Sequence, residues 1–201
     1  METPPKSRGG RPRSFDREQA IETAMRLFWR HGYEGVSIGD LTDAIGIAAP
    51  SLYAAFGSKA GLFVEALARY EASAGSFDPA QLGAASSVED AVRRLLEGGI
   101  QAVTAPDRER GCMISSGMIA CHPEHEALAR DLSRRRGAMR DAIGLALQQW
   151  VGARQAAALA RYLTAVMQGI SIQARDGATA AELQVIVNEV VAGLAARPAA
   201  G

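Results

Sequence analysis

Two hydroxyl groups and one ammonium group stand close together in one short stretch of the chain. They belong to Ser51, Tyr53 and Lys59 within GIAAPSLYAAFGSK, residues 46–59. All three side chains can donate hydrogen bonds to an anion such as a phosphate. Lys59 also follows Ser58, which is expected to cap a helix, and the N–H groups at a helix N-terminus favour an anion. The spacing therefore predicts a surface that binds phosphate groups.

A second set of reactive side chains lies in GCMISSGMIACHPEH, residues 111–125. Cys112 is expected at a helix start, where the pKa of a thiol is lowered, so it can act as a redox or electrophile sensor. The alternative is that it is a small buried core residue. Cys121, His122 and His125 are types that bind metals, but no CxxC pair or second cluster accompanies them. We therefore expect no metal site and no cofactor.

The helix expected from Ala49 to Phe56 must position the first set, and it has almost no bulk on its outer face. Leu52 and Phe56 are four residues apart and are expected to point inward. Pro50 is compatible with the first turn of a helix, where no intrahelical partner for its N–H is lost. A face this thin allows close approach to another molecule. The small residues of that face are Ala48, Ala49, Ser51 and Ala54.

A short helix precedes it across a glycine turn. Ser37 is expected to cap this helix, with Asp40 in the position that closes a capping box. Gly46 ends it after about two turns. Two short helices joined in this way predict a helix-turn-helix unit, whose second helix enters the major groove of DNA. Ser51 can then donate to a base edge or a phosphate, whereas Tyr53 and Lys59 are expected to contact phosphates. The other DNA contacts predicted for this unit are Ser37, Ala48, Ala49, Pro50 and Ala54.

A basic arm precedes the first helix although the formal net charge of the 201-residue chain is zero. Within GGRPR, residues 9–13, Arg11 and Arg13 are suited to a narrow, A·T-rich minor groove, whose negative potential attracts arginine. The alternative is a flexible solubilising tail or a cloning remnant. We expect the arm to bind DNA, because it ends just before the first helix.

Residues 24–63, AMRLFWRHGYEGVSIGDLTDAIGIAAPSLYAAFGSKAGLF, resemble the DNA-binding domain of the TetR/AcrR (tetracycline-repressor-like) family of transcriptional regulators. The later segments GCMI and QGISIQARDG are similar to segments of some members. The resemblance implies an all-α homodimer that binds a palindromic DNA operator and is released by a small-molecule effector. Repression is the commoner behaviour in the family, and activation stays open. In this chain Ala48 stands where the family often has a capping serine, which weakens the N-terminus of the helix. Ala49 follows where a polar or basic residue is common in the family, which leaves little side-chain readout of bases.

We expect three parts in the chain, and helices throughout the two larger ones. They are a flexible basic arm over residues 1–14, a three-helix helix-turn-helix domain over 15–74, and a helical effector-binding and dimerisation bundle over 75–201. Long helices are expected from Ser86 to Pro106, from Pro123 past residue 147, over 153–175 and over 179–196. The last of these is expected to begin with a capping box formed by Thr179 and Glu182.

The last two long helices are expected to form the dimer interface, because each carries an apolar stripe. The alternative is that these stripes close the core of one subunit. The predicted interface residues are Leu159, Leu163, Val166, Ile186, Val190 and Leu194.

An effector pocket is expected among the middle helices. Methionine adapts to varied apolar shapes, which favours a lipophilic effector. The alternative is that these side chains are ordinary core. The predicted lining is Ile100, Cys112, Met113, Met118, Ile119, Met139, Ile143, Met167 and Ile170.

Composition and motifs argue against other classes of protein. Apolar residues make up 48% of the chain, yet no run reaches the ~18 apolar residues of a membrane span. The N-terminus has no apolar run of the kind that a secretory signal contains, so we expect a cytoplasmic protein with free thiols. No Ser-His-Asp set or phosphate-binding glycine loop is recognisable, so an enzyme or small-molecule carrier is only a distant alternative.

Overall fold

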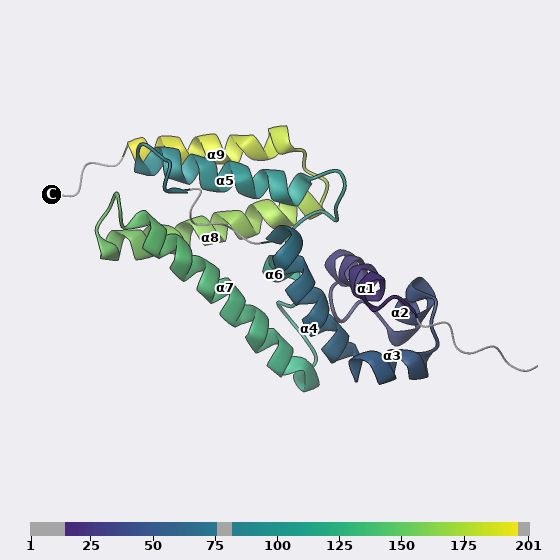
Figure 1. Ribbon diagram of the computed structural model, residues 1–201. Coiled ribbons are helices and arrows are strands. Elements are labelled where there is room, and N and C mark those ends of the chain that lie inside the picture. Colours follow the sequence, from purple (N-terminus) through teal and green to yellow (C-terminus); the bar gives the residue numbers. More distant parts are fainter. Residues whose placement is uncertain (1–14, 76–81, 197–201) are drawn as a thin grey trace, which may run out of the picture.

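The computed structural model of the protein describes residues 15–75 and 82–196, and these residues form helices and connecting turns without any strand (Figure 1). The all-α prediction is confirmed. The helices of the N-terminal part are α1 (Arg17–His31), α2 (Ile38–Ile45), α3 (Ala49–Phe56) and α4 (Lys59–Tyr70), followed by one π-helical turn, Glu71–Gly75. The helices of the C-terminal part are α5 (Val88–Thr104), α6 (Met113–Ser116), α7 (Glu126–Leu147), α8 (Ala153–Arg175) and α9 (Ala180–Ala195), with a 3-10 turn, Pro123–His125, directly before α7.

Polar side chains cap most of these helices where the sequence predicts it. Ser37 and Asp40 close a capping box at α2, and Thr179 and Glu182 close another at α9. The predicted start of α5 is one residue early. Ser87, rather than Ser86, accepts the N–H of Asp90, whereas the N–H of Ser86 donates to the Asp90 carboxylate. Either serine can use the same acidic partner, so the sequence alone does not distinguish them.

Two hydrophobic cores hold the described residues together. The first gathers α1 to α4 around Phe28 and Phe63, whose rings meet edge to face with centroids 5.0 Å apart. Met113, Met118 and Leu132 also belong to this first core, so α6 and the beginning of α7 pack against the N-terminal helices. The second core joins α5, α8, α9 and the end of α7.

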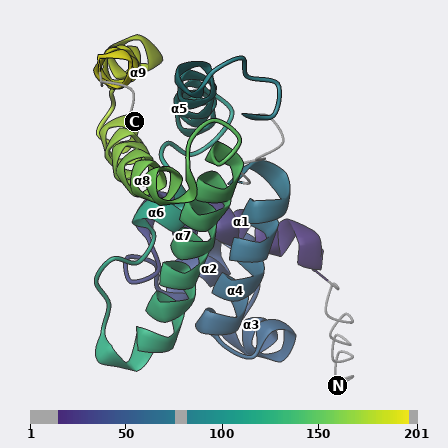
Figure 2. The ribbon, with the colours of Figure 1, turned by 90° about the vertical axis from the view of Figure 1, so that its left-hand side faces the viewer.

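Figures 1 and 2 show the same arrangement from two directions. Helix α3 lies at one end of the molecule, and the neighbouring helices α5 and α9 lie at the other end. Helix α7 runs between the two ends. None of the helices in the described stretches is both long and apolar enough to cross a membrane.

Candidate nucleic-acid interface and internal cavity

Helix α3 divides its residues between a buried face and a bare outer face. Leu52 is 0% exposed and Phe56 is 7% exposed, so both anchor α3 to the first core. Tyr53 is 47% exposed. Neither the Tyr53 hydroxyl nor the Ser51 hydroxyl bonds to a described residue, so both can donate to a partner. The remaining predicted contacts on this face are Ala48, Pro50 and Ala54, which are exposed, and Ala49, which is half-buried.

The turn between α2 and α3 depends on Gly46. Its backbone lies in the left-handed region, with φ 77° and ψ 34°, which costs glycine far less than other residues. The N–H groups of Gly46 and Ile47 both donate to the carbonyl oxygen of Thr42, at 2.8 and 3.1 Å. These bonds satisfy the end of α2 and allow the chain to enter α3 directly.

The two helices of this unit differ at their N-termini. Ser37 donates its hydroxyl proton to the Asp40 carboxylate at 2.7 Å, so this predicted DNA contact is already engaged within α2. The backbone N–H of Ser37 also donates to Asp40, and these bonds lower the pKa of that carboxyl group. At α3 the N-cap residue Ala48 makes no side-chain hydrogen bond. Pro50 has no N–H group, and the N–H groups of Ser51 and Leu52 both donate to the backbone carbonyl of Ala48, at 2.9 and 3.2 Å.

Lys59 lies at the first position of α4, next to α3. Its ammonium nitrogen is 4.1 Å from the centre of the Tyr33 ring, a cation–π contact. Partial burial lowers the pKa of Lys59, while the nearby carboxylates of Glu34 and Asp40 raise it. Sequence reasoning missed Tyr33. The sequence HGY places an aromatic residue two positions after the end of α1, and this residue could have been considered as a neighbour of the DNA-binding surface.

The two predicted arm residues, Arg11 and Arg13, lie outside the described residues. The other predicted DNA contacts are contributed by three consecutive elements, namely the start of α2, the exposed face of α3 and the start of α4. This arrangement can present hydroxyl, ammonium and backbone N–H donors to a phosphate backbone while a thin helix enters a groove.

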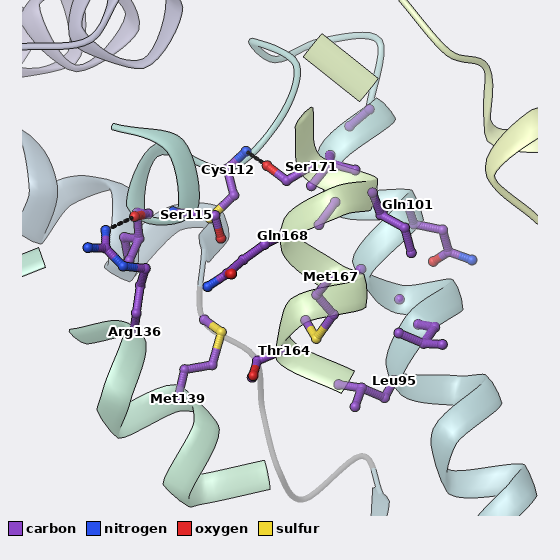
Figure 3. Close-up of a pocket in the computed structure, with 18 of the residues that line it drawn as sticks. Leu95, Gln101, Cys112, Ser115, Arg136, Met139, Thr164, Met167, Gln168 and Ser171 are labelled. Atoms are coloured by element: carbon purple, nitrogen blue, oxygen red, sulfur yellow. Dashed lines mark hydrogen bonds between the residues drawn. The ribbon is translucent and has the colours of Figure 1, made fainter. Parts of the chain in front are cut away.

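A cavity of about 460 Å³ lies among α5, α6, α7 and α8 (Figure 3). This volume is within the range of ~300–1,000 Å³ that small-molecule sites occupy. Four of the residues predicted to line an effector pocket, Cys112, Met139, Met167 and Ile170, line this cavity.

The other predicted lining residues do not reach this cavity. Met113 and Met118 are buried in the first core, against the N-terminal helices. Ile100 and Ile143 are buried in the second core, and Ile119 is 72% exposed at the surface. For Met113, Met118 and Ile119 the physical reason is the short α6, where the chain turns beside the first core. Ile100 and Ile143 lie on the faces of α5 and α7 that pack in the second core rather than on those that line the cavity.

Polar residues form much of the cavity wall, and sequence reasoning missed them because it considered only apolar side chains. The polar and charged lining residues are Arg94, Gln101, Asp107, Arg108, Ser115, Arg136, Thr164, Gln168 and Ser171. The sequence does show polar residues close to Met139, Met167 and Ile170 at helical spacing, and this pattern could have identified them.

Cys112 lines the cavity and lies next to residues of both the N-terminal and the C-terminal part of the chain. Its backbone N–H donates to the Ser171 hydroxyl of α8 at 2.8 Å, and its thiol accepts the N–H of Ser115 at 3.5 Å. The phenol of Tyr70, at the end of α4, lies beside the thiol. Burial raises the pKa of Tyr70 well above its usual range, and the proximity of Cys112 raises it further.

Cys121, His122 and His125 lie near the surface. Glu34 accepts the backbone N–H of His122 at 3.0 Å and lies 2.8 Å from Nδ1 of His125. Cys112 and Cys121 are both free thiols. Within the described stretches, no three His, Cys, Asp or Glu side chains form a group that could hold a metal ion.

Most of the predicted dimer residues face the core of the subunit. Leu159, Leu163 and Val190 are at most 6% exposed, because the stripes of α8 and α9 pack on α5 and on α7. Val166, Ile186 and Leu194 are half-buried at the edge of the same core. The larger apolar side chains that α8 and α9 leave exposed are Tyr162, Ile172 and Val185.

Comparison with known proteins places these features in context. The family model described as bacterial regulatory proteins, tetR family, matches residues 20–66, which span α2, α3 and most of α1 and α4. The chain is 38% identical to the HTH-type transcriptional repressor ComR of Escherichia coli K12 over 192 residues, which cover 90% of this chain and 89% of ComR. It is 33% identical to the repressor BdcR of the same organism, over 84% of this chain and 83% of BdcR.

A solved structure of the TetR family regulator CifR is also similar. It contains a cysteine mutant of CifR in complex with 26-bp double-strand operator DNA, and it aligns with a TM-score of 0.82 and 36% sequence identity. The alignment covers 94% of this chain and 100% of the CifR chain.

Proposed function

Because this chain belongs to the TetR family of bacterial transcriptional regulators, we propose that it represses transcription by binding a palindromic DNA operator as a homodimer. The outer face of α3 enters the major groove, where Ser51 donates to a base edge or a phosphate. Tyr53 and Lys59 hold the flanking phosphates. The protein acts as a binding protein in the cytoplasm rather than as an enzyme.

The single observation that carries this proposal is the outer face of α3. Its side chains are small or carry an unengaged hydroxyl group, while Leu52 and Phe56 fix the helix to a rigid core. A helix that must approach base pairs within a groove only ~12 Å wide needs this combination. The Ala48 and Ala49 positions add little base readout, so phosphate contacts supply much of the affinity.

Dimerisation through the outer surfaces of α8 and α9 would place two copies of α3 in successive major grooves. Tyr162, Ile172 and Val185 provide exposed apolar area for this interface, with exposed fractions of 43%, 44% and 59%. Two such helices from each subunit pack as a four-helix interface. The six stripe residues predicted from the sequence then support the interface from within the subunit.

The cavity among α5 to α8 is proposed as the effector site. An effector that binds better to the conformation with low DNA affinity shifts the population away from the operator. Its volume and its contacts with Met139, Met167 and Ile170 support a ligand with a substantial apolar part.

A second candidate is regulation by a thiol. Cys112 lines the cavity and also lies beside Tyr70 of the N-terminal part, so modification of its sulfur would affect both sides of the junction. Treatment with hydrogen peroxide or iodoacetamide should release DNA from the wild type but not from a Cys112→Ser variant. Equal responses of the two proteins would exclude this mode.

Fluorescence anisotropy with the promoter nearest to the gene tests the main proposal. We expect salt-sensitive and sequence-selective binding with two subunits for each site. Removal of residues 1–13 should lower the affinity mainly for operators with A·T-rich flanks. Equal binding to the promoter and to scrambled DNA would contradict the proposal.

The oligomeric state needs its own measurement. Val185→Glu should convert the dimer to a monomer in light scattering, because it places a charge in the proposed interface. Leu145→Glu is the matched control, since Leu145 is 70% exposed on α7. A Val185→Glu protein that stays dimeric would show that another surface forms the interface.

A further inference from the structure

The cavity wall is rich in positive charge. Arg94, Arg108 and Arg136 line it, against one aspartate, Asp107. Two of the three arginines already have a carboxylate partner. Arg94 is 3.0 Å from Asp90, and Arg108 is 3.9 Å from Asp107.

Arg136 differs from the other two. Within the described stretches no carboxylate lies within 4.0 Å of its guanidinium group, which is half-buried where α7 faces α6. One nitrogen donates to the backbone carbonyl of Ile114 at 2.9 Å, a bond drawn in Figure 3. Burial lowers the pKa of Arg136, and the only group that raises it is Cys112. A guanidinium group has five N–H donors, so most of them are left for another acceptor.

Burial of a charge without a counter-charge is unfavourable. Arginine binds carboxylates through two parallel hydrogen bonds, which a lysine or an amide cannot reproduce. A ligand carboxylate at this point would therefore supply the counter-charge that Arg136 lacks among the described residues. The Ser115 hydroxyl, which also lines the cavity and bonds to no other described residue, offers a second donor.

The apolar part of the wall lies beside this cationic part. In Figure 3 the side chains of Met139 and Met167 project into the space between α7, α8 and α5, and Arg136 rises from α7 toward α6. A molecule with a charged end and an apolar body would match both surfaces at once.

We propose that the effector is a small amphipathic carboxylate whose anionic group pairs with Arg136 and whose apolar body packs on Met139 and Met167. This inference rests on the proposed role of the cavity as the effector site. It goes beyond that role by naming the chemical class of the ligand and the residue that selects it. A neutral molecule of the same length would leave Arg136 without a counter-charge and bind less tightly.

Isothermal titration calorimetry with matched probes tests this inference. Hexanoate, octanoate and decanoate are each compared with the primary alcohol of the same chain length. We expect at least one carboxylate to bind about tenfold more tightly than its alcohol, which corresponds to about 1.4 kcal/mol. Equal affinity within each pair, or no binding of any carboxylate, would overturn the proposal.

Variants of α7 assign the effect to Arg136. Arg136→Gln should weaken carboxylate binding about tenfold or more and leave alcohol binding unchanged. Arg136→Lys should restore part of the loss. Arg134→Gln is the matched control, because Arg134 is two residues away, does not line the cavity and pairs with Asp131 at 2.7 Å. A loss of the same size in the Arg134 variant would refute the assignment.

The comparison of wild-type probes needs no variant, so it holds even if Arg136→Gln folds poorly after losing its bond to Ile114. Promoter binding is measured by anisotropy in parallel. A protein that binds its promoter but does not prefer carboxylates refutes this inference and leaves the proposed repressor intact. A protein that prefers carboxylates through Arg136 but binds no promoter refutes the proposed function and leaves the ligand class standing.

Discussion

Arg175, in the last turn of α8, donates a hydrogen bond of 3.1 Å to the backbone carbonyl of Trp29 in α1. The same guanidinium group donates to the carbonyl of Arg30 at 2.8 Å, so it satisfies two carbonyl groups at the end of α1. The indole N–H of Trp29 donates to the carbonyl of Gly111, just before α6, at 2.9 Å. The helix that forms one cavity wall is therefore bonded directly to the first helix of the DNA-binding unit.

Replacement of Arg175 by Met should loosen this junction. The variant loses hydrogen bonds to Trp29, to Arg30 and to the Ser116 hydroxyl. We expect the free energy of unfolding to fall by about 2 kcal/mol, since bonds from a charged donor are each worth about 1.5–3 kcal/mol and part of the loss is recovered by water. Amide hydrogen exchange in the last turn of α1 should rise, as measured by mass spectrometry. Arg161→Met, an exposed position on the same helix, should change neither quantity.

The N-terminus of α3 can be strengthened by one substitution. Ala48 makes no side-chain hydrogen bond as N-cap, so Ala48→Ser should raise the free energy of unfolding by about 1 kcal/mol in urea titrations. Ser37→Ala is the comparison, because it removes a cap that α2 already has and should lower stability by about the same amount. An unchanged midpoint for Ala48→Ser would mean that the backbone at Ala48 does not allow a serine to reach the N–H groups of α3.

Tyr53→Phe and Lys59→Ala should weaken binding to all DNA sequences alike, because both residues are proposed to contact phosphates. Lys59→Ala should also reduce the slope of log affinity against log salt by about one, since one fewer counterion is released. Anisotropy titrations over a series of salt concentrations measure both effects. Arg154→Ala removes a charge from the first turn of α8, far from α3 in Figure 1, and should leave the slope unchanged. A change of sequence preference in either test variant would show contact with bases instead.

The sequence predicts most of the helix caps and turns correctly, because these features depend on residues that are close together in the chain. The caps at Ser37 and Thr179 and the glycine turn at Gly46 depend on neighbours within four residues, so spacing alone identifies them. The inward pair Leu52 and Phe56 follows from helical periodicity in the same way.

The environment of each apolar residue could not be predicted in this way, because it depends on which elements meet. Met113 and Met139 are both predicted to line the pocket. In the structure Met113, on α6, is buried in the first core, whereas Met139 lines the cavity. Leu163 reads as an interface residue, but α5 and α7 cover it. The role of Arg136 was hidden for the same reason, since its lack of a counter-charge is a property of the assembled cavity wall.

Glu34 should make the stability of the protein depend on pH at the junction between α1 and the start of α7. The backbone N–H of His122 and the ring of His125 hold the pKa of Glu34 below its usual range. A lowered carboxyl pKa means that the folded state favours the charged form, so the contribution is fully present above the unfolded value of about 4.5. It is lost as the pH falls through the lower pKa of the folded state.

Glu34→Gln should therefore reduce the free energy of unfolding by no more than about 1 kcal/mol at pH 7, a size typical of exposed pairs. The difference from wild type should shrink toward pH 3. Urea titrations at several pH values measure this, with Glu126→Gln as the control at an exposed position nearby. A difference that stays constant from pH 7 to pH 3 would show that Glu34 acts through packing rather than through its charge.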